Sequence, residues 1–179
     1  MAEAFSNKLT RAAGIVTTSS SGAVGIGTTI ITGISTVGVA VSDLVDNTNF
    51  IAGTKVSAIG INTVYADRDS TNTAAASAQV FKFLGMTTAY TSAAATKSIL
   101  IGGTFANNTT SSVNLTVEIH DASAGVQAAL ASKIPVPTGS SFVISDAGKS
   151  VLEANDEVRV FCDTANAIDV NLSILTGVS

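Results

Sequence analysis

The chain has 179 residues, a net charge of −4 and a single cysteine. Its nine basic residues are scattered rather than clustered, which argues against nucleic acid as a partner because phosphate binding needs grouped Lys and Arg side chains. One cysteine excludes an intrachain disulfide. No apolar run approaches the roughly 18 residues of a membrane span, and the first residues lack the apolar segment of a secretory signal. These features predict a protein that stays in the compartment where it is made, with no membrane partner.

The surface should be easy to bury against other subunits. Apolar residues make up 46% of the chain and charged residues only 12%, so Ser, Thr and Asn must supply most of the polar surface. Burying short side chains immobilises few rotatable bonds and therefore costs little conformational entropy. We expect part of this surface to contact neighbouring subunits in a homo-oligomer.

The N-terminal region, residues 1–22, is interpreted as an arm followed by a first strand. Residues 1–13 are compatible with a short helix, since Phe5 and Leu9 would lie one turn apart on one face. They are equally compatible with a flexible arm that orders only against a neighbour. Residues 14–18 are β-branched and predict a short strand.

Residues 23–92 form a glycine-punctuated region, interpreted as a small inserted β-domain. The Ala-rich stretch 73–78 is more consistent with an extended link than with a helix, because it is short and flanked by Ser, Thr and Asn. Residues 87–96 are small and polar and are the best candidate for a linker. The candidate strands are residues 28–31, 38–41, 54–59, 63–66 and 79–84.

Residues 93–179 carry the clearest strand pattern in the chain. From Ser112 to His120 apolar and polar residues alternate without error, which places Asn114, Thr116, Glu118 and His120 on the face opposite the core. The same alternation recurs in residues 157–162 and 168–174, with turn-forming clusters between the runs. Residues 125–132 predict a one-turn helix or a crossover loop, and the prolines at 135 and 137 predict a sheet edge. The chain is therefore predicted to be all-β, with a C-terminal antiparallel sandwich of jelly-roll or immunoglobulin-like type.

One segment resembles a short β-module that recurs in phage fibres and other virion appendages. In that module a phrase "GI-x-V-G-D-x-V" precedes "I-x-x-G-T-x-V-x-x-I". The corresponding text here is ISTVGVAVSDLV at residues 34–45 and FIAGTKVSAIG at residues 50–60. Ser42 stands where the module usually has glycine before Asp43.

Residues 8–18 joined to residues 99–174 resemble a family of small virion structural proteins from T4-like phages of marine cyanobacteria. The matching phrases are FSNKLTRAAG, ILIGGTFANNTTSSVNLTVEI, IPVPTGSSFVI and VLEANDEVRVFCDTANAIDVNLSIL. In that family the opening phrase runs almost directly into the sandwich, so residues 23–92 would be an insertion. The resemblance implies a component of a phage particle without indicating which part.

The two residues best suited to covalent chemistry have simpler structural interpretations. His120 is the single histidine, and a Ser-His-acid triad would have to use it, but no G-x-S-x-G elbow is present. Cys162 shares its parity with Val158 and Val160, so we expect it to point into the core. We therefore predict no catalytic residue.

Three other motifs are weak signals for binding. Residues 22–27 resemble a phosphate loop but lack its Lys-Ser/Thr and a following helix, so a hairpin turn is expected. Residues 67–71 begin like a calcium loop, yet Asn72 and Ala78 occupy the positions of its glycine and its bidentate glutamate. The expected reading there is a solvated turn, and we predict no metal and no cofactor. Solvated turn edges are also expected for Asp43, Asp46, Glu153, Asp156 and Glu157.

Together these observations predict a non-enzymatic structural subunit of a tailed-phage virion, in a head-decorating, neck or tail position, assembled in the host cytoplasm. Its partners would be copies of itself and other virion proteins such as the major capsid, neck or tail subunits. The alternative is a module of a virion appendage that binds carbohydrate or the host surface, with Tyr65 and Tyr90 as the aromatic candidates. Sequons beginning at Asn108, Asn114 and Asn171 are expected by chance in a chain this rich in Ser and Thr.

Overall fold

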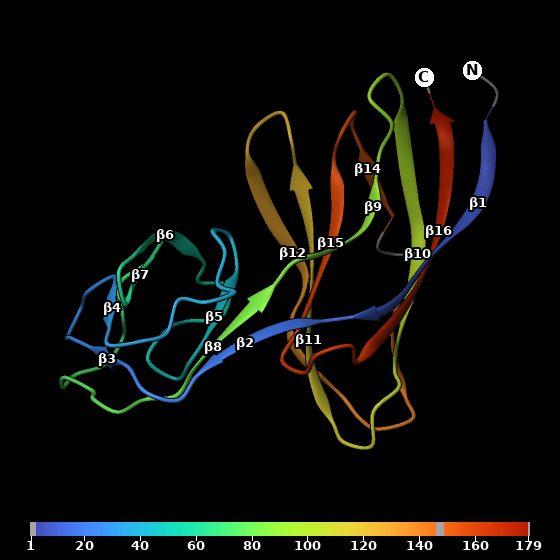
Figure 1. Cartoon of the computed structure of the whole chain (residues 1–179). Helices are drawn as coiled ribbons and strands as arrows, with labels where there is room; N and C mark the ends of the chain where they lie inside the picture. The colour runs from blue at the N-terminus through green and yellow to red at the C-terminus, as the bar shows by residue number, and fades with distance from the viewer. Residues whose placement is uncertain (1–2, 146–148, 179) are drawn as a thin grey trace. The chain divides into compact units, whose positions relative to one another are not determined.

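The protein is built from antiparallel strands, as Figure 1 shows. The computed structural model describes residues 3–145 and 149–178, and there is no helix among them. The predicted all-β fold is confirmed. The chain divides into two compact units, one made of Met1–Gly14 with Thr87–Ser179 and the other of Ile15–Met86.

The larger unit contains two sheets. All neighbouring strands in both sheets are antiparallel. The five-stranded sheet comprises β1 (Ala4–Ala13), β16 (Ile168–Val178) and β10 (Lys97–Asn107), with β13 (Ser141–Ile144) and β14 (Ser150–Leu152) both along the far side of β10. The four-stranded sheet has the order β12 (Val126–Val136), β11 (Val113–Asp121), β15 (Glu157–Cys162), β9 (Thr87–Thr91).

The strand order of the larger unit is that of a jelly roll. With β13 and β14 taken as two pieces of one edge position, each sheet has four positions, in the orders β1-β16-β10-β13/β14 and β9-β15-β11-β12. Apart from the β11–β12 hairpin and the step from β13 to β14, consecutive strands of the unit lie in opposite sheets. Eight positions wound in this way form the double-sheet arrangement of jelly rolls. Of the two predicted sandwich types, the observed order is therefore the jelly roll.

The core of the larger unit lies between its two sheets. Inward positions alternate along each strand, as in β16, where Val170, Leu172 and Ile174 are buried and the intervening residues are more exposed. Leu100 and Phe105 from β10 and Leu115 from β11 belong to the same cluster. The predicted alternation thus builds the core.

At one end of the sandwich, Asn107 ties the loops together. Its Nδ2 donates to the carbonyl oxygens of Ser111 (2.8 Å) and Val136 (2.9 Å), while its Oδ1 accepts from the backbone N–H and the hydroxyl of Thr109, both at 2.8 Å. Gly14 and Thr87, where the chain leaves and re-enters the unit, are joined by a 3.3 Å bond from the Gly14 N–H to the Thr87 hydroxyl. The inserted residues thus begin and end at adjacent points of the sandwich.

The smaller unit also contains two antiparallel sheets. Its core includes Phe81 and Phe83, whose rings lie 6.5 Å apart, together with Ile31 and Val64. The three-stranded sheet has the order β2 (Ile15–Ser19), β8 (Phe81–Gly85), β5 (Leu44–Asp46), and the four-stranded sheet the order β3 (Ala23–Val24), β4 (Ile30–Thr32), β7 (Thr63–Ala66), β6 (Val56–Gly60).

Both interpretations of residues 1–13 were wrong. The described part of this segment is β1, an edge strand paired with β16 from Ala4↔Thr176 to Ala13↔Ile168. The spacing of Phe5 and Leu9 fits a strand as well as a helix, because residues four apart also share a strand face. Pairing with β16 provides hydrogen-bond partners for the backbone groups along one edge of this segment. The local sequence does not indicate that this pairing occurs.

Three other local expectations were also wrong. Residues 87–96, predicted as a linker, contain β9, which pairs with β15. Residues 125–132, predicted as a helix or crossover loop, mostly belong to β12, whose small residues pair along β11. Residues 38–41 form turns rather than a strand, with Gly38 at φ 80°. The unit boundaries accordingly fall at 14/15 and 86/87, where the expected ranges were 1–22, 23–92 and 93–179.

Candidate functional site

His120 and Cys162 do not form a catalytic pair. In the β11–β15 ladder Cys162 lies opposite Leu115, and His120 lies opposite Glu157. The two residues are therefore separated by five positions, or about 17 Å at a strand rise of about 3.3 Å per residue. Cys162 is fully buried in the sandwich core, which confirms the expectation that it packs as a small apolar residue.

The polar residues around His120 form a charged cluster on the four-stranded sheet. Arg159 Nε lies 2.7 Å from Glu157 Oε2, and both side chains are largely shielded from solvent. Glu118, opposite Arg159, is buried, as is Thr116, whose hydroxyl accepts the N–H of Lys133 at 3.0 Å. Thr116 and Glu118 alternate with the core residues Leu115 and Val117, as predicted, but the expectation that their side of β11 is solvated was wrong at these two positions. This cluster contains charges but no activated nucleophile.

Two of the acidic residues expected at solvated turn edges, Asp43 and Asp156, are buried. Asp43 Oδ2 accepts the N–H of Ala40 at 2.8 Å, and burial raises the pKa of this carboxyl above its ordinary value. Asp156 accepts the N–H groups of Ala122 (3.0 Å) and Glu153 (2.9 Å), which joins two loops of the sandwich. These carboxylates organise turns, and the expectation of solvation was wrong for both.

The glycine-rich residues 22–27 belong to a hairpin, as predicted. β3 pairs with β4 in the register Ala23↔Thr32 and Val24↔Ile31. Ser70, from the segment 67–71 that begins like a calcium loop, closes this hairpin, because its hydroxyl donates to the Gly25 carbonyl at 3.0 Å and accepts the Thr28 N–H at 3.2 Å. Asp67 Oδ1 likewise accepts the N–H of Lys55 at 2.8 Å.

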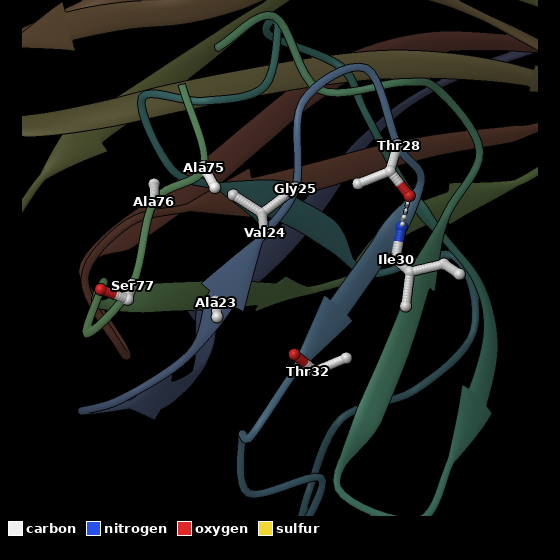
Figure 2. A pocket seen from close by; sticks show the side chains of 9 residues that line it. All are labelled: Ala23, Val24, Gly25, Thr28, Ile30, Thr32, Ala75, Ala76 and Ser77. Carbon is white, nitrogen blue, oxygen red and sulfur yellow. Dashed lines mark hydrogen bonds between the residues drawn. The ribbon is translucent and has the colours of Figure 1, made fainter. Parts of the chain in front are cut away.

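A shallow hollow of about 410 Å³ lies beside this hairpin. Figure 2 shows Ala23, Thr32 and Ile30 on one side and the short side chains of Ala76 and Ser77 on the other. Of the described residues that line it, none is acidic, basic or aromatic. The hollow offers methyl groups and the hydroxyls of Thr28, Thr32 and Ser77.

The two tyrosines differ in availability. The Tyr90 hydroxyl lies 2.8 Å from Ser98 Oγ, and Ser98 in turn contacts Ser92 Oγ at 3.0 Å. Tyr65 is 38% exposed and stands opposite Ile30 in the four-stranded sheet of the smaller unit. Among the sequon residues, Asn114 donates its Nδ2 to Asp163 Oδ2 at 2.7 Å and is thereby engaged.

Several exposed apolar side chains lie on the outer side of the five-stranded sheet, which we call the outer face. β1, β16 and β10 lie side by side there (Figure 1). Two rows of side chains cross the strands. The first row consists of Phe5, Leu175, Ile99 and Val151. The second row consists of Leu9, Asn171, Thr104 and Val143.

The outer face has no charged side chain in its middle and carries its charges toward its ends. Phe5 and Leu9 are 68% and 73% exposed. Between the two rows runs a lower strip of Asn7, Ser173 and Gly102, and a hollow of about 250 Å³ opens beside Gly102. Toward one end Asp169 accepts the N–H of Ala12 at 2.9 Å, and toward the other Lys97 Nζ lies 2.9 Å from Glu153 Oε1.

Sequence reasoning missed the outer face. Its first row joins residues 5, 99, 151 and 175, which are brought together only by strand pairing. The available signal was in β16, where Leu175 follows the polar outward residues Asp169, Asn171 and Ser173. That signal has no meaning until the neighbouring strands are known.

The fold and this surface define an all-β protein, a jelly roll with a small β-unit inserted between its first two strands. Among residues 3–145 and 149–178 there is no group of three or more His, Cys, Asp or Glu side chains placed to hold a metal ion. Over the same residues there is no helix of the length and apolarity needed to cross a bilayer. No family model, no curated protein and no solved structure matches the chain.

Proposed function

We propose that this chain is a non-enzymatic structural subunit of a tailed-phage virion, which assembles through the faces and edges of its sandwich as a head-decorating, neck or tail component. The observation that carries the proposal is the first row of the outer face. Phe5 and Val151 are both more than half exposed at its two ends. Exposed apolar side chains in such a row do not stabilise a free monomer, whereas burying them against another surface stabilises the resulting complex.

The roles of the reactive residues support the same proposal. Cys162 is used in the core, and Asp43 and Asp156 hold turns. Jelly rolls occur in viral capsid proteins and in lectins, so the fold is compatible with the proposal without selecting it. The sequence phrases that resemble virion proteins lie mainly in β1, β10, β11, β15 and β16, the strands that build the sandwich.

The decisive experiment is to locate the chain in purified particles of the phage that encodes it. Antibodies raised against the recombinant protein should label one defined part of the particle in immunogold electron microscopy. Mass spectrometry of particles purified through a density gradient should recover its peptides at a fixed ratio to the major capsid protein. Detection in infected cells together with absence from purified particles would refute the proposal.

The second candidate function is binding of carbohydrate or the host surface, and one observation favours it. Tyr65 exposes its ring next to Ile30, and Ile30 also lines the hollow of Figure 2. An exposed aromatic beside a shallow hollow is a common platform for sugar rings. A glycan array should give a micromolar hit that Tyr65→Ala abolishes and Tyr90→Phe retains. An array without such a hit would dismiss this function.

A further inference from the structure

The outer face carries large apolar side chains in its first row and smaller ones in the strip beside it, where the bulged Ile101 borders the hollow at Gly102. Phe5, Leu175, Ile99 and Val151 form a raised row, and the adjacent strip falls to Ser173 and to Gly102, which has no side chain. A Cβ at Gly102 would lie 2.8 Å from the Ile144 carbonyl oxygen, so the close approach of β13 keeps this position empty. The strip is thus a groove running alongside a ridge.

We propose that a second copy of this chain packs face to face on the outer face, with the first row of each copy seated in the strip of the other. A two-fold axis lying in the interface, between the first row and the strip, produces this arrangement for both copies at once. Such an interface is isologous, which is the commonest form of homo-oligomer contact. Sheets stacked in this manner lie about 10 Å apart with their strands nearly aligned.

Charge favours a second copy over a partner of different chemistry. The two rows and the strip contain no charged side chain. At the ends of the face the charges are of both signs: Lys97 pairs with Glu153, and Arg11 and Asp169 line one hollow with Leu9 and Thr104. A strongly acidic or basic partner would therefore meet balanced charges at the ends and none in the middle, whereas a second copy presents an equally uncharged centre. Interface cores are depleted of charge in this way.

The edge of the same sheet is less suited to self-association than its face. Lys8 lies on edge strand β1 opposite the core residue Leu172 and is exposed. An inward-facing charge on an edge strand disfavours pairing with another strand, because the charge would have to be buried. Self-association is thereby directed to the outer face.

The size of the outer face predicts a weak contact. Four strands about 4.8 Å apart and about nine residues at about 3.3 Å each give roughly 400–500 Å² per copy. This is below the roughly 800 Å² per partner of a standard stable interface, and so predicts a concentration-dependent dimer. The inference rests on the proposed function in one respect, since weak contacts suffice where many copies are held in one particle.

Sedimentation velocity of the full chain tests the inference. The concentration should run from about 5 to about 500 µM, because a micromolar contact populates both monomer and dimer in this range. The mass should rise toward that of a dimer, and Val151→Lys should weaken association at least about tenfold. The matched control is Val126→Lys, because Val126 on β12 is also 58% exposed but lies in the other sheet. A monomer at every concentration, or equal effects of the two substitutions, would overturn the proposal.

A cross-link distinguishes the face from other contacts and does not depend on how a lysine affects folding. Ser173→Cys should be joined between copies by a short bismaleimide, whereas the unchanged chain, whose Cys162 is buried, and Val126→Cys should not. Failure of Ser173→Cys to cross-link in a dimeric sample would place the contact elsewhere. If the chain forms this dimer but is absent from purified particles, the proposed function is refuted and the interface stands. If the chain is found in particles but is monomeric at every concentration, the interface is refuted and the proposed function stands.

Discussion

Asn107 offers the sharpest test of how the sandwich is held together. We consider Asn107→Leu, which keeps the number and branching of the side-chain heavy atoms but removes every polar atom. The side chain is only 3% exposed and makes four hydrogen bonds, two as donor and two as acceptor. The loops that it joins connect strands of opposite sheets, so its loss should be felt by the whole larger unit.

The expected loss follows from the bond count. At about 1 kcal/mol net per bond the four bonds give about 4 kcal/mol. The Val136 carbonyl keeps a longer 3.4 Å bond from Ser112, and Thr109 is only partly buried, so we expect about 3 kcal/mol. For a unit of roughly a hundred residues this lowers the melting temperature by roughly 10–20 °C.

Tyrosine fluorescence can follow each unit by itself, because Tyr90 is the sole tyrosine of the larger unit and Tyr65 that of the smaller. In a Tyr65→Phe background, urea unfolding monitored at Tyr90 reports the larger unit. Asn108→Leu is the control, since Asn108 is adjacent and exposed. A loss below about 1 kcal/mol, or one no greater than that of Asn108→Leu, would show that Asn107 does not organise these loops.

Three further predictions concern single residues. Ser42 has φ 75°, a conformation that suits glycine, so Ser42→Gly should stabilise the smaller unit by about 1 kcal/mol in urea unfolding, whereas Ser35→Gly should not. Because burial raises the pKa of Asp43, its contribution to stability is complete below the unfolded value near 3.8 and is lost as the pH rises through the folded value. Asp43→Asn should therefore raise the melting temperature of the smaller unit at pH 7 and flatten its pH dependence, unlike the exposed Asp69→Asn; matching profiles for the two variants would contradict this. Lys8→Val should produce thioflavin-positive aggregates through the uncovered β1 edge while Lys8→Glu stays dispersed, and equal solubility would show that Lys8 does not guard the edge.

Much of the fold could be predicted from local pattern. Alternation identified β11, β15 and β16, β-branched runs identified β2 and β7, and the pattern of Val80, Phe81 and Phe83 identified β8. Pro135 was placed correctly at a sheet edge, since it lies on the outermost strand β12. The failures included β12, which is rich in Ala, and β9, whose small polar residues resembled a linker; the strand conformation of both comes from pairing with β11 and β15.

The candidate surface was predictable only in kind. Low charge and many small residues indicated a surface that other subunits could cover, but they did not indicate which surface. Ser42 shows a related limit, because the sequence revealed a departure from the module's usual glycine and only the backbone revealed that this position still needs positive φ.

The sequence by itself determined that the protein is all-β, that Cys162 belongs to the core and that glycine-rich residues 22–27 make a hairpin. These features depend on the alternation of neighbouring residues and on local turn chemistry, and both can be recognised from consecutive residues in the sequence. The tertiary structure alone decided the jelly-roll order, the burial of Asp43 and Asp156, and the row from Phe5 to Val151. Each of these depends on pairing between residues far apart in the chain, and a strand's own residues do not specify its neighbour.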